Sequence, residues 1–140
     1  IAFCDIEYKG LTFCGMARCH PDDKDMQSRL TGKTIAEFRA TVKYLKFIRD
    51  FEITPQLKSL NQLYYSMNHS KYFDPKSYEA KMLYRQIKNL KEDLETIKEE
   101  IQYQKDSLKA YLEAKEVDHA KIRAHKSKKE LAEDNQESCN

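Results

Sequence analysis

The sequence contains few residues that end or turn secondary structure, with only three Gly and three Pro among its 140 residues. Because Gly and Pro are the strongest local breakers, we expect few elements, most of them long. The sequence also lacks an apolar run near the roughly 20 residues that a membrane-spanning helix needs. It shows no charged stretch followed by an apolar one, as a secretory signal would. We therefore expect one domain, or one small domain with a helical extension, and no membrane partner.

Cysteine and net charge are also low. The four cysteines, Cys4, Cys14, Cys19 and Cys139, are spread unevenly, unlike the dense, paired cysteines of a small secreted domain. This pattern favours a reducing, cytoplasmic setting. The net charge of +2 removes the simplest electrostatic case for binding nucleic acid or a membrane, although it is compatible with a local basic face. Charged residues make up 34% of the chain, which is typical of a protein with long exposed helices.

The dominant pattern is a heptad repeat over residues 74–129, a stretch with no Gly and no Pro after Pro75. One seven-residue position holds Ala80, Ile87, Leu94, Ile101 and Leu108, and the other holds Leu83, Leu90, Ile97 and Tyr111. Only Gln104 interrupts this apolar stripe. The pattern predicts a long coiled-coil helix, about 80 Å in length if it is continuous.

This apolar stripe predicts self-association. The two helices expected before it would be only about 28 Å and 22 Å long, so they could not cover it from about Leu94 onward. The predicted oligomerisation residues are Ile87, Leu90, Leu94, Ile97, Ile101 and Leu108. A parallel homodimer is favoured, because it sets Asp93 and Glu100 of one helix against lysines of the other, whereas an antiparallel dimer opposes lysine to lysine. A break near residues 102–107, which would fold the segment into a helical hairpin, is the alternative.

Residues 1–16 alternate polar and apolar side chains and predict a β-hairpin with Lys9-Gly10 as its turn. If Tyr8 opposes Leu11, Cys4 opposes Gly15, and the thiols of Cys4 and Cys14 point to opposite faces of the hairpin. A disulfide between these two cysteines is therefore disfavoured.

Three local signals predict helix starts. Thr34-Ile35-Ala36-Glu37 matches a capping box, and the helix after it runs to about Glu52. Thr54-Pro55 opens a second helix that ends near Asn68, and Asp74-Pro75 opens the long helix. The predicted fold is therefore mainly α, with a small N-terminal β-hairpin, two short amphipathic helices and one long C-terminal coiled-coil helix. The expected divisions are an α+β head (1–73), the coiled-coil helix (74–129) and a disordered tail (130–140).

Catalytic and metal-binding patterns are weak. Cys14, Cys19 and His20 are candidate zinc ligands, but adjacent Cys and His rarely bind one metal together, and small buried thiols in a hairpin explain the pattern more simply. Thr31-Gly32-Lys33-Thr34 resembles the end of a phosphate-binding loop but lacks the preceding Gly, because position 27 is Gln. No residues supply a nucleophile, a base and an anion hole together, so we expect no enzyme and no cofactor.

The most informative feature for function is a cluster of aromatic and basic residues around residues 58–85. The predicted partner-binding residues are Tyr64, Tyr65, Lys71, Tyr72, Phe73, Lys76, Lys81 and Arg85. Such a surface suits a protein interface, and it can also stack bases and bind phosphates.

We therefore expect a non-enzymatic interaction protein, which would be an adaptor, an inhibitor or a structural subunit. The short, Lys- and Tyr-rich chain is typical of small accessory proteins of phages or mobile elements. Two alternatives stay open: a nucleic-acid-binding protein, and an oligomeric binder of small anionic nucleotides.

Overall fold

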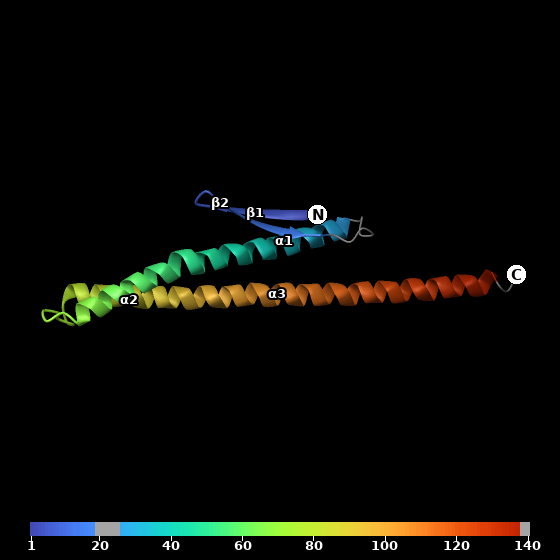
Figure 1. Ribbon diagram of the computed structural model, residues 1–140. Helices are drawn as coiled ribbons and strands as arrows, with labels where there is room; N and C mark the ends of the chain where they lie inside the picture. The colour runs from blue at the N-terminus through green and yellow to red at the C-terminus, as the bar shows by residue number, and fades with distance from the viewer. Residues whose placement is uncertain (19–25, 138–140) are drawn as a thin grey trace. The chain divides into compact units, whose positions relative to one another are not determined.

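The computed structural model describes residues 1–18 and 26–137 and shows a mainly helical protein with an N-terminal hairpin (Figure 1). The elements in chain order are β1 (Ala2–Tyr8), β2 (Leu11–Ala17), α1 (Met26–Phe47), the π-helix η1 (Ile48–Ile53), α2 (Thr54–Asn68) and α3 (Tyr78–Glu137). The fold class predicted from the sequence is confirmed. The chain divides into two compact units, Ile1–Lys105 and Asp106–Asn140. The predicted division into head, coiled coil and tail stays a prediction.

The hairpin has the predicted register. Tyr8 pairs with Leu11 and Cys4 with Gly15 along an antiparallel ladder. The turn residues Lys9 and Gly10 have φ angles of 48° and 76°, as expected for a tight two-residue hairpin turn that follows the twist of the strands. Cys4 and Cys14 lie on opposite faces of the two-stranded sheet, and both thiols are free.

The hairpin packs on α1 (Figure 1), through aromatic rings near its turn and through small residues further along. Gly32, Ala36 and Ala40 follow one another at intervals of four, share one face of α1 and are buried. A Cβ added at Gly15 would lie 2.5 Å from the backbone nitrogen of Ala40 and closer still to the carbonyl oxygen of Ala36. Strand β2 and α1 therefore approach as closely as their backbones allow.

This packing corrects the expected start of the first helix. Gly32 and Thr34 lie inside α1, which is already helical at Met26, and the Thr34 hydroxyl donates to the carbonyl of Leu30 at 3.0 Å. The predicted capping box is therefore wrong. Gly32 is buried on the same face as Ala36 and Ala40, four residues apart, so this glycine lies within the helix and does not mark a break.

A second contact holds the turn of the hairpin on η1. The Glu52 carboxylate accepts hydrogen bonds from the Lys9 ammonium at 3.0 Å and from the Tyr8 hydroxyl at 2.9 Å. The bond from Lys9, together with the weaker effect of Tyr8, lowers the pKa of Glu52 below its usual range. The rings of Tyr8 and Tyr44 pack edge to face beside this contact, with centroids 5.3 Å apart.

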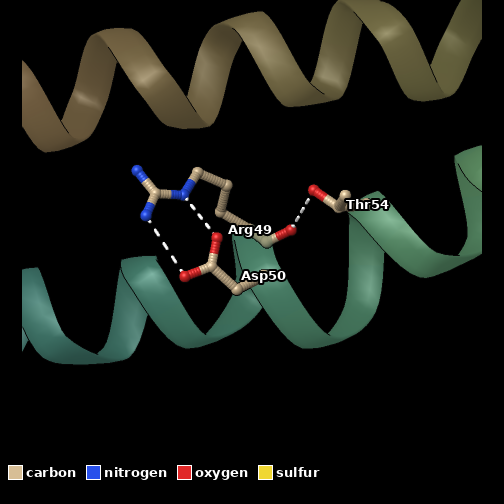
Figure 2. A network of polar contacts seen from close by, with 3 residues as sticks. All are labelled: Arg49, Asp50 and Thr54. Carbon is tan, nitrogen blue, oxygen red and sulfur yellow. Dashed lines mark hydrogen bonds and ion pairs between the residues drawn. The ribbon is translucent and has the colours of Figure 1, made fainter.

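Helix α2 begins at Thr54 and ends at Asn68, as predicted, but η1 joins it to α1, so residues 26–68 are helical without interruption. Pro55 has no N–H, and in an α-helix its ring would clash with the carbonyl four residues earlier. The wider turn of η1 relieves this clash: the N–H of Thr54 bonds to the carbonyl of Arg49, five residues back. The Thr54 hydroxyl donates to the same carbonyl at 2.6 Å, and the guanidinium of Arg49 pairs with Asp50 at 2.7 Å (Figure 2).

Helix α3 starts later than predicted. The Asp74 carboxylate accepts from the N–H of Lys76 at 2.9 Å and forms a local turn. Ser77 is the residue that caps the helix, because its hydroxyl oxygen accepts from the N–H of Ala80 at 3.2 Å. Residues 102–107 are helical, so the alternative of a hairpin there is not observed, and α3 extends past residue 129 to Glu137.

Within the first unit, α3 turns back along α2 and η1 (Figures 1 and 2). Ala80, Leu83, Ile87 and Ile101 are buried in the single chain, and only 4% of Ile101 is exposed. The expectation that the apolar stripe lacks an intramolecular partner from about Leu94 onward is therefore wrong at Ile101. The expectation treated the two preceding helices as separate, whereas η1 joins them into one helical run, residues 26–68, that is longer than either.

Candidate functional site

Three aromatic residues from different segments meet where a turn joins α2 to α3. The ring of Tyr64 on α2 lies 6.2 Å from that of Phe73 in the turn and 6.4 Å from that of Tyr84 on α3, measured between centroids. Tyr64 and Phe73 are half-buried, whereas 60% of Tyr84 is exposed. The first two rings therefore hold the turn against the helices, and Tyr84 presents an aromatic surface to solvent.

Basic side chains lie beside this aromatic corner. Lys81, Arg85 and Lys88 are spaced by four and three residues, so they share one face of α3. With Tyr64 and Tyr84 they line a groove of about 610 Å³, whose other lining residues are Pro75, Ala80, Asn89 and Glu92. Glu92 is the single acidic residue of this lining, so the groove, hereafter the aromatic–basic groove, carries a net positive charge.

These three cations form no ion pair within the described part of the chain. In the part of the chain that the structure describes, no carboxylate lies within ion-pair distance of Lys81, Arg85 or Lys88. Elsewhere in the first unit, Lys9 and Lys98 each pair with a glutamate. The cations of the groove are therefore available to an anionic ligand.

The structure divides the predicted partner-binding residues among three places. Tyr64, Lys81 and Arg85 line the aromatic–basic groove, and Phe73 supports it from behind. Lys71, Tyr72 and Lys76 lie exposed in the turn between α2 and α3, where 90% of Tyr72 is accessible. Tyr65 lies outside this groove, with its ring 4.0 Å from that of His69.

Tyr65 belongs to a second depression of about 770 Å³, formed entirely by α2 and also lined by Thr54, Leu57, Lys58, Asn61, Gln62 and Ser66. Because one helix supplies every lining residue, no second element positions a ligand there. The prediction missed Lys88 of the aromatic–basic groove, although its spacing of seven from Lys81 was a usable signal.

The predicted oligomerisation residues are placed unevenly. Ile87 and Ile101 are buried within one chain, whereas Leu90, Leu94 and Ile97 are half-buried in the first unit. Leu108 is half-buried in the second unit. Self-association through α3 stays a prediction, and it cannot use Ile87 or Ile101 without displacing contacts that the chain makes with itself.

The metal candidates are placed only in part. Cys14 lies on the outer face of the hairpin, where a hydrogen bond with Asp5 and partial burial raise the pKa of its thiol. Cys19 and His20 lie outside the described residues. Within residues 1–18 and 26–137, no three His, Cys, Asp or Glu side chains are grouped so as to hold a metal ion.

Comparison with models of protein families, with curated proteins and with solved structures finds no match to this chain. Among the described residues, no helix combines the length and the apolar composition that a membrane crossing requires.

Proposed function

We propose that this protein is a cytoplasmic, non-enzymatic binding protein that holds an acidic segment of a protein partner in the aromatic–basic groove. Its role would be that of an adaptor, an inhibitor or a structural subunit. The observation that carries the proposal is the row formed by Lys81, Arg85 and Lys88, which has no carboxylate partner among the described residues and lies beside two tyrosines.

The composition of the groove supports a protein ligand. Tyrosine and arginine are enriched at the residues that dominate protein interfaces, because they offer a large contact area together with directed hydrogen bonds. Tyr64 is held in place by Phe73, so it loses little freedom when a ligand binds. A segment with two or three carboxylates would match the charge of the groove. An apolar side chain in the same segment would cover the exposed ring of Tyr84.

A nucleic acid or a small anionic nucleotide would use the same groups differently. Exposed Tyr84 could stack a base while Arg85 and Lys88 contact phosphates. Binding of that kind weakens steeply as salt rises, since each neutralised phosphate releases counterions. The salt dependence therefore separates these alternatives from a protein ligand.

The test compares two triple variants on the same helix. The groove variant carries Lys81→Glu, Arg85→Glu and Lys88→Glu. The control reverses the exposed cations Lys91, Lys105 and Lys109, none of which lines the groove, so both variants change the net charge equally. The probes are a fluorescein-labelled peptide that alternates Glu and Phe, and a single-stranded DNA of 20 thymidines, each titrated by fluorescence anisotropy at several salt concentrations.

We expect the groove variant to bind the acidic peptide at least tenfold more weakly, while the control stays within twofold of the wild type. Equal loss in the two variants would show that only net charge matters and would contradict the proposal. The DNA could instead bind tightly, with an affinity that falls steeply as salt rises, and this binding could be lost in the groove variant alone. That result would assign the groove to nucleic acid.

A further inference from the structure

The hairpin forms a two-stranded sheet, so each strand has one edge that its neighbour does not pair. The edge of β2 is occupied by side chains of α1. The Lys43 ammonium donates to the carbonyl of Cys14 at 2.6 Å, and the Arg39 guanidinium donates to the carbonyl of Met16 at 2.6 Å. These bonds occupy two of the carbonyl acceptors, those of Cys14 and Met16, that another strand would use on that side.

Within residues 1–18 and 26–137, no side chain covers the edge of β1 in this way. In a hairpin with a two-residue turn, Tyr8 and Leu11 bond to each other, so every second residue of β1 directs its N–H and carbonyl away from β2. These residues are Phe3, Asp5 and Glu7. Among the described residues, no group bonds to their backbone, and the ladder runs from Ala2 to Tyr8 without the proline or bulge that commonly blocks an exposed edge.

The side chains along this edge show which strand would fit. Asp5 and Glu7 lie exposed on the outer face of the sheet, and Phe3, 60% exposed, pairs there with Met16, 41% exposed. A second copy of β1 paired antiparallel about its centre would set two Asp5 carboxylates side by side, which is unfavourable. A strand with cations opposite Asp5 and Glu7 and an apolar residue opposite Phe3 matches the edge in charge and in hydrophobicity.

The edge is also held in position before any strand is added. The backbone contact of Gly15 with α1 fixes the sheet on the helix, and the bonds of Glu52 fix its turn. A rigid edge loses little conformational entropy when it pairs, which increases the affinity for an added strand.

We propose that β1 binds an extended basic segment of a partner polypeptide as a third, antiparallel strand. This surface goes beyond the proposed function, since it lies on the hairpin, attracts the opposite charge and shares no residue with the aromatic–basic groove. Backbone hydrogen bonds at Phe3, Asp5 and Glu7 would supply the affinity, and the two carboxylates would select basic sequences.

The test uses the labelled peptide Lys-Val-Lys-Val-Phe, whose lysines and phenylalanine oppose Glu7, Asp5 and Phe3 in an antiparallel strand. In that strand the amides of Lys, Lys and Phe face β1, and the amides of the two Val face solvent. Methylating the facing amides removes the edge bonds, and methylating the two Val amides is the matched control. Fluorescence anisotropy reports binding to the full chain.

We expect methylation of the facing amides to weaken binding at least tenfold and methylation of the Val amides to change it less than twofold. Asp5→Lys with Glu7→Lys should weaken binding about fivefold or more and favour Glu-Val-Glu-Val-Phe instead. Reversal of Glu99 and Glu113, exposed on α3, is the protein control and should leave binding within twofold.

Three outcomes would overturn the proposal. The first is equal binding of the two methylated peptides, and the second is equal binding of the basic peptide by the variant changed at Asp5 and Glu7 and the control changed at Glu99 and Glu113. The third is no binding at millimolar peptide. Light scattering supplies a fourth, since a dimer that Glu7→Pro dissociates would assign the edge to a second copy of this chain. The groove variant of the preceding section should bind the basic peptide no more weakly than the wild type, so failure here and failure of the proposed function are distinguishable.

Discussion

The contact between Gly15 and α1 leads to a quantitative prediction for Gly15→Ala. The new Cβ would lie 2.5 Å from the Ala40 nitrogen, whereas ordinary contact begins at 3.4 Å, so the hairpin must move outward by about 0.9 Å or more. The obstacles are backbone atoms of a helix, which cannot rotate away as a side chain would. Overpacking costs about 1–3 kcal/mol, and we expect a value near 3 kcal/mol because the backbone of α1 cannot yield.

The displacement should also loosen the rest of this interface. A gap of about 0.5–1 Å forfeits a quarter to a half of the dispersion energy at each contact. Ala36 and Ala40, both fully buried against the hairpin, would lose part of their packing. Since small domains are stable by only about 5–15 kcal/mol, this loss is large enough to measure.

Urea denaturation followed by circular dichroism measures the free energy of unfolding, and site-resolved alkylation measures docking of the hairpin. Cys4 faces α1 and should react faster in Gly15→Ala, whereas Cys14 on the outer face should react at an unchanged rate. Gly10→Ala is the control: it meets no atom within 4 Å but has φ +76°, so it should cost about 1–2 kcal/mol without exposing Cys4. A loss below about 1 kcal/mol for Gly15→Ala, with unchanged alkylation of Cys4, would refute the close approach.

Three further predictions test other contacts. Because the folded pKa of Glu52 is lowered, the stabilisation by this carboxylate is present above its ordinary pKa of about 4 and is lost as pH falls through the lowered value. The difference in urea midpoint between wild type and Glu52→Gln should therefore shrink from pH 7 to pH 3, and a constant difference would contradict the contact. Thr54→Val should cost about 0.5–1.5 kcal/mol by removing the bond to Arg49, whereas Thr54→Ser should keep most of it; equal losses would exclude this role of the hydroxyl. Ile101→Ala should cost about 2–5 kcal/mol, with a melting temperature independent of protein concentration over a hundredfold range; a concentration-dependent melt would show that a second chain covers Ile101.

The parts of the fold that depend on residues close together in the sequence were predictable from it. Alternating side chains on both sides of Lys9-Gly10 define the two strands, their turn and their register, because pairing across a two-residue turn leaves no freedom of alignment. The heptad pattern likewise predicts α3, whose apolar residues repeat at helical spacing over several turns.

The candidate site was predictable only in part. The sequence indicated an aromatic and basic surface, and it named Tyr64, Lys81 and Arg85 correctly as residues that the structure brings together. It also grouped Tyr65 with them, although Tyr65 lies against His69 outside the groove. Two consecutive residues on a helix point about 100° apart, so nearness in sequence did not place both tyrosines on one surface.

Three residues of the sequence were misleading. Gly32, Thr34 and Pro55 are usual signals of helix ends, yet all three lie within one helical run, residues 26–68. Gly32 is buried on the same face of α1 as Ala36 and Ala40, and Pro55 is tolerated because the turn before it widens to a π-helix. The sequence by itself therefore determined which residues form strands, the hairpin turn and the long helix. Only the tertiary structure decided that the first arm continues through Pro55 and that the chain buries Ile101 itself, because packing of elements distant in sequence outweighs a local preference of about 1–3 kcal/mol.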